Sequence, residues 1–351
     1  MKFLSAKNMV LGGALLAFSI PSHAVVLKQK WQAGQKLVYA VDLDGTANLQ
    51  LPPDAPGAMF LGGAPLEVPM KGEGLASLDT LKVDDAGTGT VAVTLPQWKM
   101  SAQVPMPSIL GQVLNQKMPV QWTLRDGKSQ LSVNGQPVNL GIPQSDGKAT
   151  QAVKIGTNGQ LQGVEPIADP SKPATQTPAK VGDQGAAVVA TILRALPALW
   201  PARDVKVGDT WQANVDYPAL ARPAQNGEAA KPLGSFDLKL EGQDTIGGKT
   251  LQRVSIKGDI DLDGKTLETA FPPAPTDPNA QGKKRPQPKL DHATETVEGT
   301  VWLDASAGQV AKTELVIGGQ AQGSTPKPNG QPGSKAWFDF TGTLNMVLQP
   351  N

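Results

Sequence analysis

Apolar and polar residues alternate with a period of two through most of the chain that follows residue 24. This period is typical of strands that bury one face against a core and leave the other face in water. Turn sequences such as Asp-Gly and Gly-Gly separate the strands and supply the positive φ angles of tight hairpins. The pattern predicts three hairpins, which pair residues 120–125 with 130–133, 236–240 with 251–256, and 301–303 with 310–317.

Two segments depart from this period and instead space their apolar residues as a helix does. They are residues 107–117, with Ile109 and Leu110, and residues 183–200, with Ile192, Leu193 and Leu196. Both segments are more apolar than a helix with a solvent-facing side. We therefore expect a mainly β fold, built on antiparallel sheet, with two short apolar helices packed on it.

Proline-rich loops separate the predicted elements, and residues 165–182 are the best candidate for a divide. This divide gives an N-terminal β half over residues 25–182, and a helix with a C-terminal β half over residues 183–351. Each half opens with a glycine turn before an aromatic-bearing strand, at residues 31–39 and 205–211. The likeness fits either an internal duplication or repeated use of a common local solution, and both remain open.

The first 24 residues have the three parts of a secretory signal peptide. Lys2 and Lys7 precede an apolar run at residues 9–20, and Pro21 and Ala24 mark the cleavage region. The run of about 12 residues is too short to cross about 30 Å of hydrocarbon. The sequence predicts cleavage after Ala24, a periplasmic location and a mature chain without a transmembrane segment.

Charge and residue counts exclude several classes of function. Cleavage would leave 30 basic and 31 acidic residues, because the first 24 residues contain two of the 32 Lys and Arg residues. This near-neutral balance argues against nucleic acid as a partner. The chain has no cysteine, and His292 would be the one histidine of the mature chain. We therefore expect no thiol or histidine-rich metal site, no cofactor and no catalytic residues, and predict that the protein is not an enzyme.

The most metal-like sequence is Asp259-Ile-Asp261-Leu-Asp263-Gly264, which matches four positions of a calcium loop. The twelfth position should be a bidentate Glu but is Ala270. We interpret the string as a strand that buries its Ile and Leu and exposes its aspartates. A hydrolase based on paired acids remains a third alternative, because their separation depends on the fold.

The apolar run Met59-Phe60-Leu61 is unusual for a loop between proline and glycine clusters. It fits either a lid or contact site for an apolar ligand, or a satellite of the core. The seven tryptophans, at positions 31, 98, 122, 200, 211, 302 and 337, should mostly anchor the core, which leaves one or two to line a cavity.

The order of these features resembles a group of exported bacterial β-proteins of unknown function. The features are a Gly-Gln-Lys-Leu-Val-Tyr segment, an apolar helix, a Val-Lys-Val-Gly-Asp-Thr-Trp segment, and residues 298–304 with their Gly308 turn. In outline it is similar to the periplasmic lipoprotein carriers of the outer-membrane localisation pathway. The resemblance implies a strongly curved antiparallel sheet, an incomplete barrel, with short helices closing over its apolar concave face.

The leading hypothesis is a periplasmic binding module that shelters a lipid or acyl chain in a curved sheet. The ligand-binding candidates are Met59, Phe60, Leu61, Ile109, Leu110, Ile192, Leu193 and Leu196. The alternative is an envelope structural or assembly protein that recruits a protein partner through an edge strand or a loop.

Overall fold

The computed structural model describes residues 24–50, 65–105, 117–126, 128–138, 151–167, 199–201, 203–215, 234–264, 289–324 and 335–350. The elements within these ranges are all strands. They are β1 (Val25–Val26), β2 (Lys36–Gln50), β3 (Leu66–Val83), β4 (Gly89–Pro105), β5 (Lys117–Arg125), β6 (Lys128–Val133), β7 (Gln136–Val138), β8 (Gln151–Ile155), β9 (Leu161–Pro166), β10 (Asp204–Val205), β11 (Thr210–Val215), β12 (Gly234–Ile246), β13 (Lys249–Asp263), β14 (Lys289–Asp304), β15 (Gln309–Ser324) and β16 (Lys335–Leu348).

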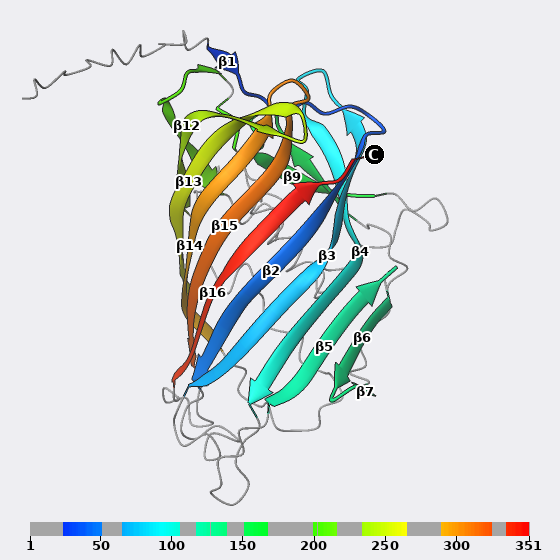
Figure 1. Ribbon diagram of the computed structural model, residues 1–351, viewed down its shortest axis with the longest axis vertical. Coiled ribbons are helices and arrows are strands. Elements are labelled where there is room, and N and C mark those ends of the chain that lie inside the picture. The colour runs from blue at the N-terminus through cyan, green and yellow to red at the C-terminus, as the bar shows by residue number, and fades with distance from the viewer. Residues whose placement is uncertain are drawn as a thin grey trace, which may run out of the picture.

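Fourteen of these strands form one antiparallel sheet, and β1 pairs with β10 beside it. The strand order is β11-β12-β13-β14-β15-β16-β2-β3-β4-β5-β6-β7. The sheet forks at β4, whose first residues pair with β8 and whose last residues pair with β5. Figure 1 shows that the sheet curves strongly, while its terminal strands β11 and β7 do not pair with each other. The predicted mainly β, curved and unclosed sheet is therefore confirmed.

The C-terminal strand β16 joins the two predicted halves. It pairs with β15 on one side and with β2 on the other, where the register runs from Trp337 opposite Gln50 to Leu348 opposite Tyr39. Both halves therefore contribute to one continuous sheet. The predicted divide at residues 182 and 183 lies outside the described residues.

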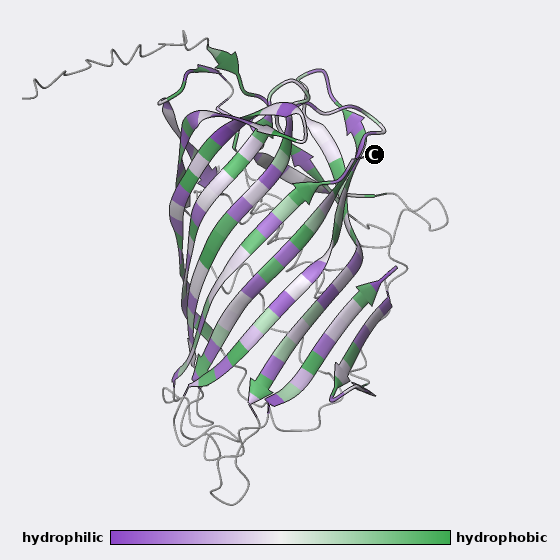
Figure 2. Ribbon diagram, in the orientation of Figure 1, coloured by the Kyte–Doolittle hydropathy of each residue, from purple (hydrophilic) through white to green (hydrophobic). Residues whose placement is uncertain are grey.

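The two faces of the sheet differ as the period of two requires. On the inner, concave face of β2, Tyr39 and Val41 are 2% and 1% exposed. On the outer face, Asp42 and Asp44 are exposed to solvent. The alternation continues along the neighbouring strands (Figure 2). One end of the sheet, here called the turn end, carries the turns that precede β2 and β11; the opposite end is called the far end.

All three predicted hairpins are confirmed, as β5–β6, β12–β13 and β14–β15. Their turns have the expected left-handed residues: Asp126 at φ 50°, Gly247 at 57° and Gly308 at 66°. The predicted loop at residues 50–69 is too long, because β3 already begins at Leu66. Pro69 is tolerated there because the pairing of β3 with β4 begins only at Met70.

The turns that open the two halves have the same hydrogen bonds. The N–H of Gly34 donates to Thr80 O, and the N–H of Thr80 returns to Gln35 O, each at 2.8 Å. In the second half the N–H of Gly208 donates to Leu240 O at 2.7 Å, and the N–H of Leu240 returns to Asp209 O at 3.0 Å. A β-bulge follows Thr80 and another follows Leu240. The shared local geometry fits both a duplication and a re-used solution, so the duplication stays a prediction.

The two predicted helices fall mostly outside the described residues, and their C-terminal limits were wrong. Lys117 begins β5, where it pairs with Pro105. Leu199 and Trp200 are buried but not helical. Pro197 interrupts the i to i−4 hydrogen bonds of a helix, and the N–H of Trp200 donates to Asn158 O at 3.4 Å instead.

Candidate functional site

The inner face changes character between the two ends of the sheet. At the turn end its side chains form a packed core around Tyr39, whose hydroxyl donates to Val310 O at 3.0 Å. Burial raises the pKa of Tyr39 well above its ordinary value, so the hydroxyl stays protonated as a structural donor. Towards the far end, apolar side chains on the same face are only partly buried.

We call this second region the inner patch. It comprises Leu49 on β2, Val68 and Met70 on β3, Met100 on β4, and Phe338 and Phe340 on β16. The register makes these strands adjacent, with Phe338 opposite Leu49 and with Met100 opposite Gly72. Phe338 is 39% exposed. The inner patch is therefore a contiguous apolar surface that the described chain leaves partly uncovered.

Aromatic rings of the inner face lie on glycines of the neighbouring strands. A Cβ atom on Gly45 would approach the Phe340 ring to 2.8 Å, and one on Gly342 would approach it to 2.7 Å. Likewise, a Cβ atom on Gly72 would approach the Trp98 ring to 2.9 Å. Glycine thus leaves room for large rings on a concave face, where side chains from adjacent strands converge.

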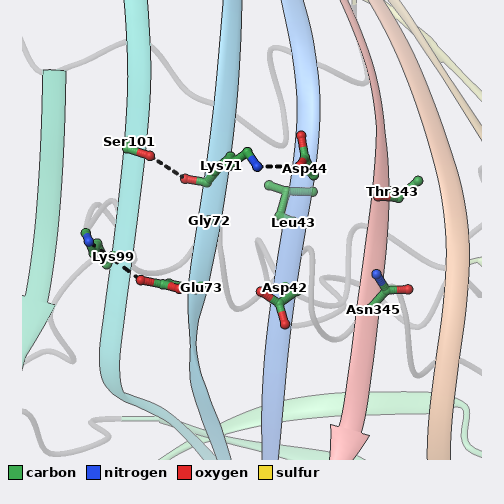
Figure 3. Close-up of a pocket in the computed structure, with 10 residues that line it drawn as sticks. All are labelled: Asp42, Leu43, Asp44, Lys71, Gly72, Glu73, Lys99, Ser101, Thr343 and Asn345. Carbon is green, nitrogen blue, oxygen red and sulfur yellow. Dashed lines mark hydrogen bonds and ion pairs between the residues drawn. The ribbon is translucent and has the colours of Figure 1, made fainter. Parts of the chain in front are cut away.

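The outer face holds a polar depression with a volume of about 560 Å³, shown in Figure 3. It lies across β16, β2, β3 and β4, on the opposite side of the sheet from the inner patch. Its lining residues are Asp42, Leu43, Asp44, Lys71, Gly72, Glu73, Lys99, Ser101, Thr343 and Asn345.

Ion pairs cross this depression. Lys71 Nζ lies 3.1 Å from Asp44 Oδ2, and Lys99 Nζ lies 3.7 Å from Glu73 Oε1. About half or more of each of these side chains is exposed, so the pairs contribute little to stability or to orienting a ligand. The depression is a solvated sheet face with charges of both signs, and its geometry favours no particular reaction.

The aspartate string lies as predicted on the outer face of β13. Ile260 and Leu262 are 1% and 6% exposed on the inner face, while Asp259 and Asp261 face solvent. His292 is exposed, and its Nε2 lies 2.7 Å from Asp261 Oδ1. In the ranges given above, no group of three His, Asp or Glu side chains is placed to hold a metal ion.

All eight predicted ligand-binding residues lie outside the described residues. They are Met59, Phe60, Leu61, Ile109, Leu110, Ile192, Leu193 and Leu196. The structure brings together a different set, because the inner patch comes from strands whose alternation was visible but whose adjacency was not. For β16 and β2, no local sequence signal reveals the pairing.

Most tryptophans anchor the core as predicted. Trp98, Trp200 and Trp302 are 3%, 2% and 8% exposed. Trp31, Trp122 and Trp211 pack against the core and are partly buried.

The fold and the inner patch define a protein with an open, curved antiparallel sheet, polar outside and apolar inside. No family model and no curated protein matches the chain. Among solved structures it is similar to the outer membrane protein OprG from Pseudomonas aeruginosa, at 11% identity and a TM-score of 0.20, over 91% of this chain and 96% of that one.

Two further structures have comparable scores. A DUF1329 family protein from Desulfovibrio piger is 8% identical with a TM-score of 0.17, over 88% of this chain and 85% of that one. OccK7 (OpdD) from P. aeruginosa is 8% identical with a TM-score of 0.20, over 90% of this chain and 100% of that one. We argue the function from the chain's own residues, because likeness at this level carries no argument. None of the described segments forms a helix long and apolar enough to cross a membrane.

Proposed function

We propose that the chain is an exported, periplasmic and non-enzymatic binding module that shelters an acyl chain against its inner patch. One observation supports this: apolar side chains on four adjacent strands remain partly exposed, while the alternate residues of those strands are mostly polar and face solvent. A soluble sheet has little reason to leave such a surface uncovered unless another molecule covers it.

The length of the apolar surface fits one acyl chain. From Leu43 to Leu49 the inner face of β2 carries Leu, Gly, Ala and Leu, which at about 3.3 Å per residue span about 20 Å. One leaflet of a bilayer, half of about 30 Å of hydrocarbon, requires about 15 Å. The inner face can therefore cover an acyl chain along its whole length.

The expected affinity follows from the buried hydrocarbon. Covering about ten methylene groups at about 0.8 kcal/mol each gives about 8 kcal/mol, which corresponds to a Kd of about 1 μM. The loss of ligand freedom on binding weakens this value, so titrations should extend from micromolar to millimolar ligand.

A pair of variants on adjacent residues of β4 tests the proposal. Met100→Glu places a carboxylate in the inner patch, and Ser101→Glu places the same charge on the outer face. With diphenylhexatriene, a hydrocarbon dye, we expect the wild-type chain to bind and Met100→Glu to bind at least ten-fold more weakly, because the carboxylate must be desolvated. Ser101→Glu should retain wild-type affinity.

Folding is checked by circular dichroism, and lipids that co-purify are identified by solvent extraction and mass spectrometry. Equal losses in the two variants, or a wild-type chain that neither binds the dye nor carries lipid, would refute the proposal.

The export step has its own test. The described residues begin at Ala24, and Val25 is already paired with Val205 in the small β1–β10 sheet. Mass spectrometry of the exported protein should find Val25 as the first residue. Recovery of the intact chain from the cytoplasm would contradict the proposed location.

An envelope-assembly role is the second candidate, and the edges of the sheet favour it. In the described part of the chain, β11 pairs only with β12 and β7 pairs only with β6. A strand with one free edge can accept a strand from a partner. Cross-linking in cells from a photoreactive residue at Gln212 on β11, compared with one at Lys257 in the middle of the sheet, would show whether a partner protein docks there.

A further inference from the structure

Two buried side-chain atoms of the inner face have no hydrogen-bond partner. They are Trp98 Nε1 and Thr313 Oγ1, on side chains that are 3% and 0% exposed. Both belong to one cross-strand row, in which Trp98 lies opposite Gly74, Gly74 opposite Val41, Val41 opposite Met346, and Met346 opposite Thr313. The four other orphaned atoms belong to Trp31, Gln35, Thr80 and Trp200, towards the turn end.

Of the two, Trp98 borders the inner patch. The next inner residue on its strand is Met100, a partly exposed member of the patch. The next inner residue after Thr313 is Leu315, which is 3% exposed and belongs to the packed core. Trp98 therefore lies where the core ends and the partly uncovered apolar surface begins.

The indole N–H lies on the patch side of the ring. A Cβ atom on Gly74 would approach Trp98 Cε3 to 2.6 Å, and one on Gly72 would approach Cζ2 to 2.9 Å. The ring thus extends over β3 from Gly74 towards Gly72, in the direction of Met70. Because Nε1 is bonded to the atom next to Cζ2, the N–H is on the Gly72 side.

An unsatisfied indole N–H in an apolar interior is costly, because the buried donor loses its water without gaining another acceptor. Trp122, on the neighbouring strand, shows the usual arrangement, since its Nε1 donates to Ser129 Oγ at 2.6 Å. No described residue accepts from Trp98. The acceptor must come from water or from a ligand.

We propose that Trp98 Nε1 anchors the polar end of the bound acyl ligand by donating a hydrogen bond to its carboxylate or carbonyl oxygen. The alkyl tail then runs from Trp98 over Gly72 and Met70 towards Phe338 at the far end. This inference rests on the proposed function and gives it a ligand class: a fatty acid or an acyl ester, bound with its oxygen end inward.

Trp98→Phe tests the anchor, because it removes the N–H and keeps an aromatic ring over Gly72 and Gly74. Palmitate, methyl palmitate and diphenylhexatriene serve as ligands, and they offer a carboxylate, an ester carbonyl and no acceptor, respectively. We expect Trp98→Phe to weaken palmitate binding about ten-fold, the typical loss of a hydrogen bond to a charged group, and to leave dye binding unchanged. A matching loss for methyl palmitate would assign the site to carbonyl oxygens in general.

Trp122→Phe is the matched control, because it removes an indole N–H that already has a partner. It should change the affinities for palmitate and the dye to the same extent. In ¹⁵N-labelled protein, the Trp98 indole signal should shift when palmitate is added and stay in place when the dye is added.

The possible failures are distinguishable. If the dye binds and Trp98→Phe leaves palmitate binding unchanged, the donor serves only a buried water and the anchor is refuted, while the proposed function stands. Equal losses for palmitate and the dye would mean that the ring acts by packing alone, which also refutes the anchor. If neither ligand binds the wild-type chain, the proposed function fails.

Discussion

Residues with no side chain decide how the inner face is packed. Gly45 and Gly342 lie side by side on β2 and β16, and the Phe340 ring covers both of them. A methyl group at Gly342 would lie 2.6 Å from Asp44 O as well as 2.7 Å from the Phe340 ring. The backbone cannot move away from this contact without disturbing the pairing of β16 with β2.

Gly342→Ala is therefore expected to lower the free energy of unfolding by about 1–3 kcal/mol through overpacking. Urea denaturation followed by circular dichroism measures the change. Gly163→Ala on β9 is the control, because its Cβ atom would meet nothing within 4 Å. A loss at Gly342 no larger than that at Gly163 would show that Phe340 adjusts freely.

Asp304, in the turn between β14 and β15, predicts a dependence of stability on pH. Burial raises the pKa of this carboxyl, but hydrogen bonds from the Ser306 hydroxyl at 2.6 Å and the Ala307 N–H at 2.9 Å outweigh it and hold the pKa below the ordinary value. The folded chain thus favours the ionised form. This stabilisation is complete above about pH 4, near the pKa in the unfolded chain, and is lost as the pH falls through the lower folded value.

Asp304→Asn should make the chain less stable at pH 7 and should flatten the loss of stability below pH 4. Urea titrations between pH 7 and pH 2 measure both effects. Parallel pH profiles for the variant and the wild-type chain would exclude this role of Asp304.

At the scale of elements, the hairpins were predictable and the long-range pairings were not. Asp126-Gly127, Gly247-Gly248 and Gly308 each specify a turn through the φ angles that they permit, so adjacent strands could be paired from sequence. The fork at β4 depends on where Pro96, in the middle of the strand, separates its partners β8 and β5. Such a division has no signature in the period of two.

The inner patch was only half predictable for the same reason. The alternation along β2, β3, β4 and β16 identified apolar faces, but which faces adjoin depends on the register of strands nearly 300 residues apart. The sequence therefore directed attention to apolar loops and helical segments, whereas Met70, Met100 and Phe338 were not recognised as one surface.

The matching turns at the starts of β2 and β11 predict matching energetics. Gly34 and Gly208 have φ angles of 79° and 94°, and a Cβ atom would meet nothing within 4 Å at either position. Gly34→Ala and Gly208→Ala should each lower the free energy of unfolding by about 1–2 kcal/mol, from backbone strain alone. Chemical denaturation of both variants measures this, and a difference above about 1 kcal/mol would show that the turns are not equivalent.

At the scale of the molecule, β16 makes the two halves one cooperative unit. Leu344 on β16 is 2% exposed and lies between Leu315 of the C-terminal half and Leu43 of the N-terminal half. We expect one calorimetric unfolding transition for the wild-type chain, because every strand of the large sheet is linked to this centre.

Leu344→Ala should lower the free energy of unfolding by about 2–5 kcal/mol and reduce hydrogen-exchange protection in both β3 and β13. Two separate transitions, or a loss of protection confined to one half, would show that the halves unfold independently.

The place of β16 beside β2 also constrains the order of events during synthesis and export. β2 is the first long strand to emerge, but the strand that completes one of its edges comprises the last residues of the chain. Until those residues arrive, β2 presents unpaired N–H and C=O groups to any other strand nearby. A newly made chain is therefore most vulnerable to mispairing just before its C-terminus is released, and a molecule that loses its last fifteen residues keeps that vulnerability permanently.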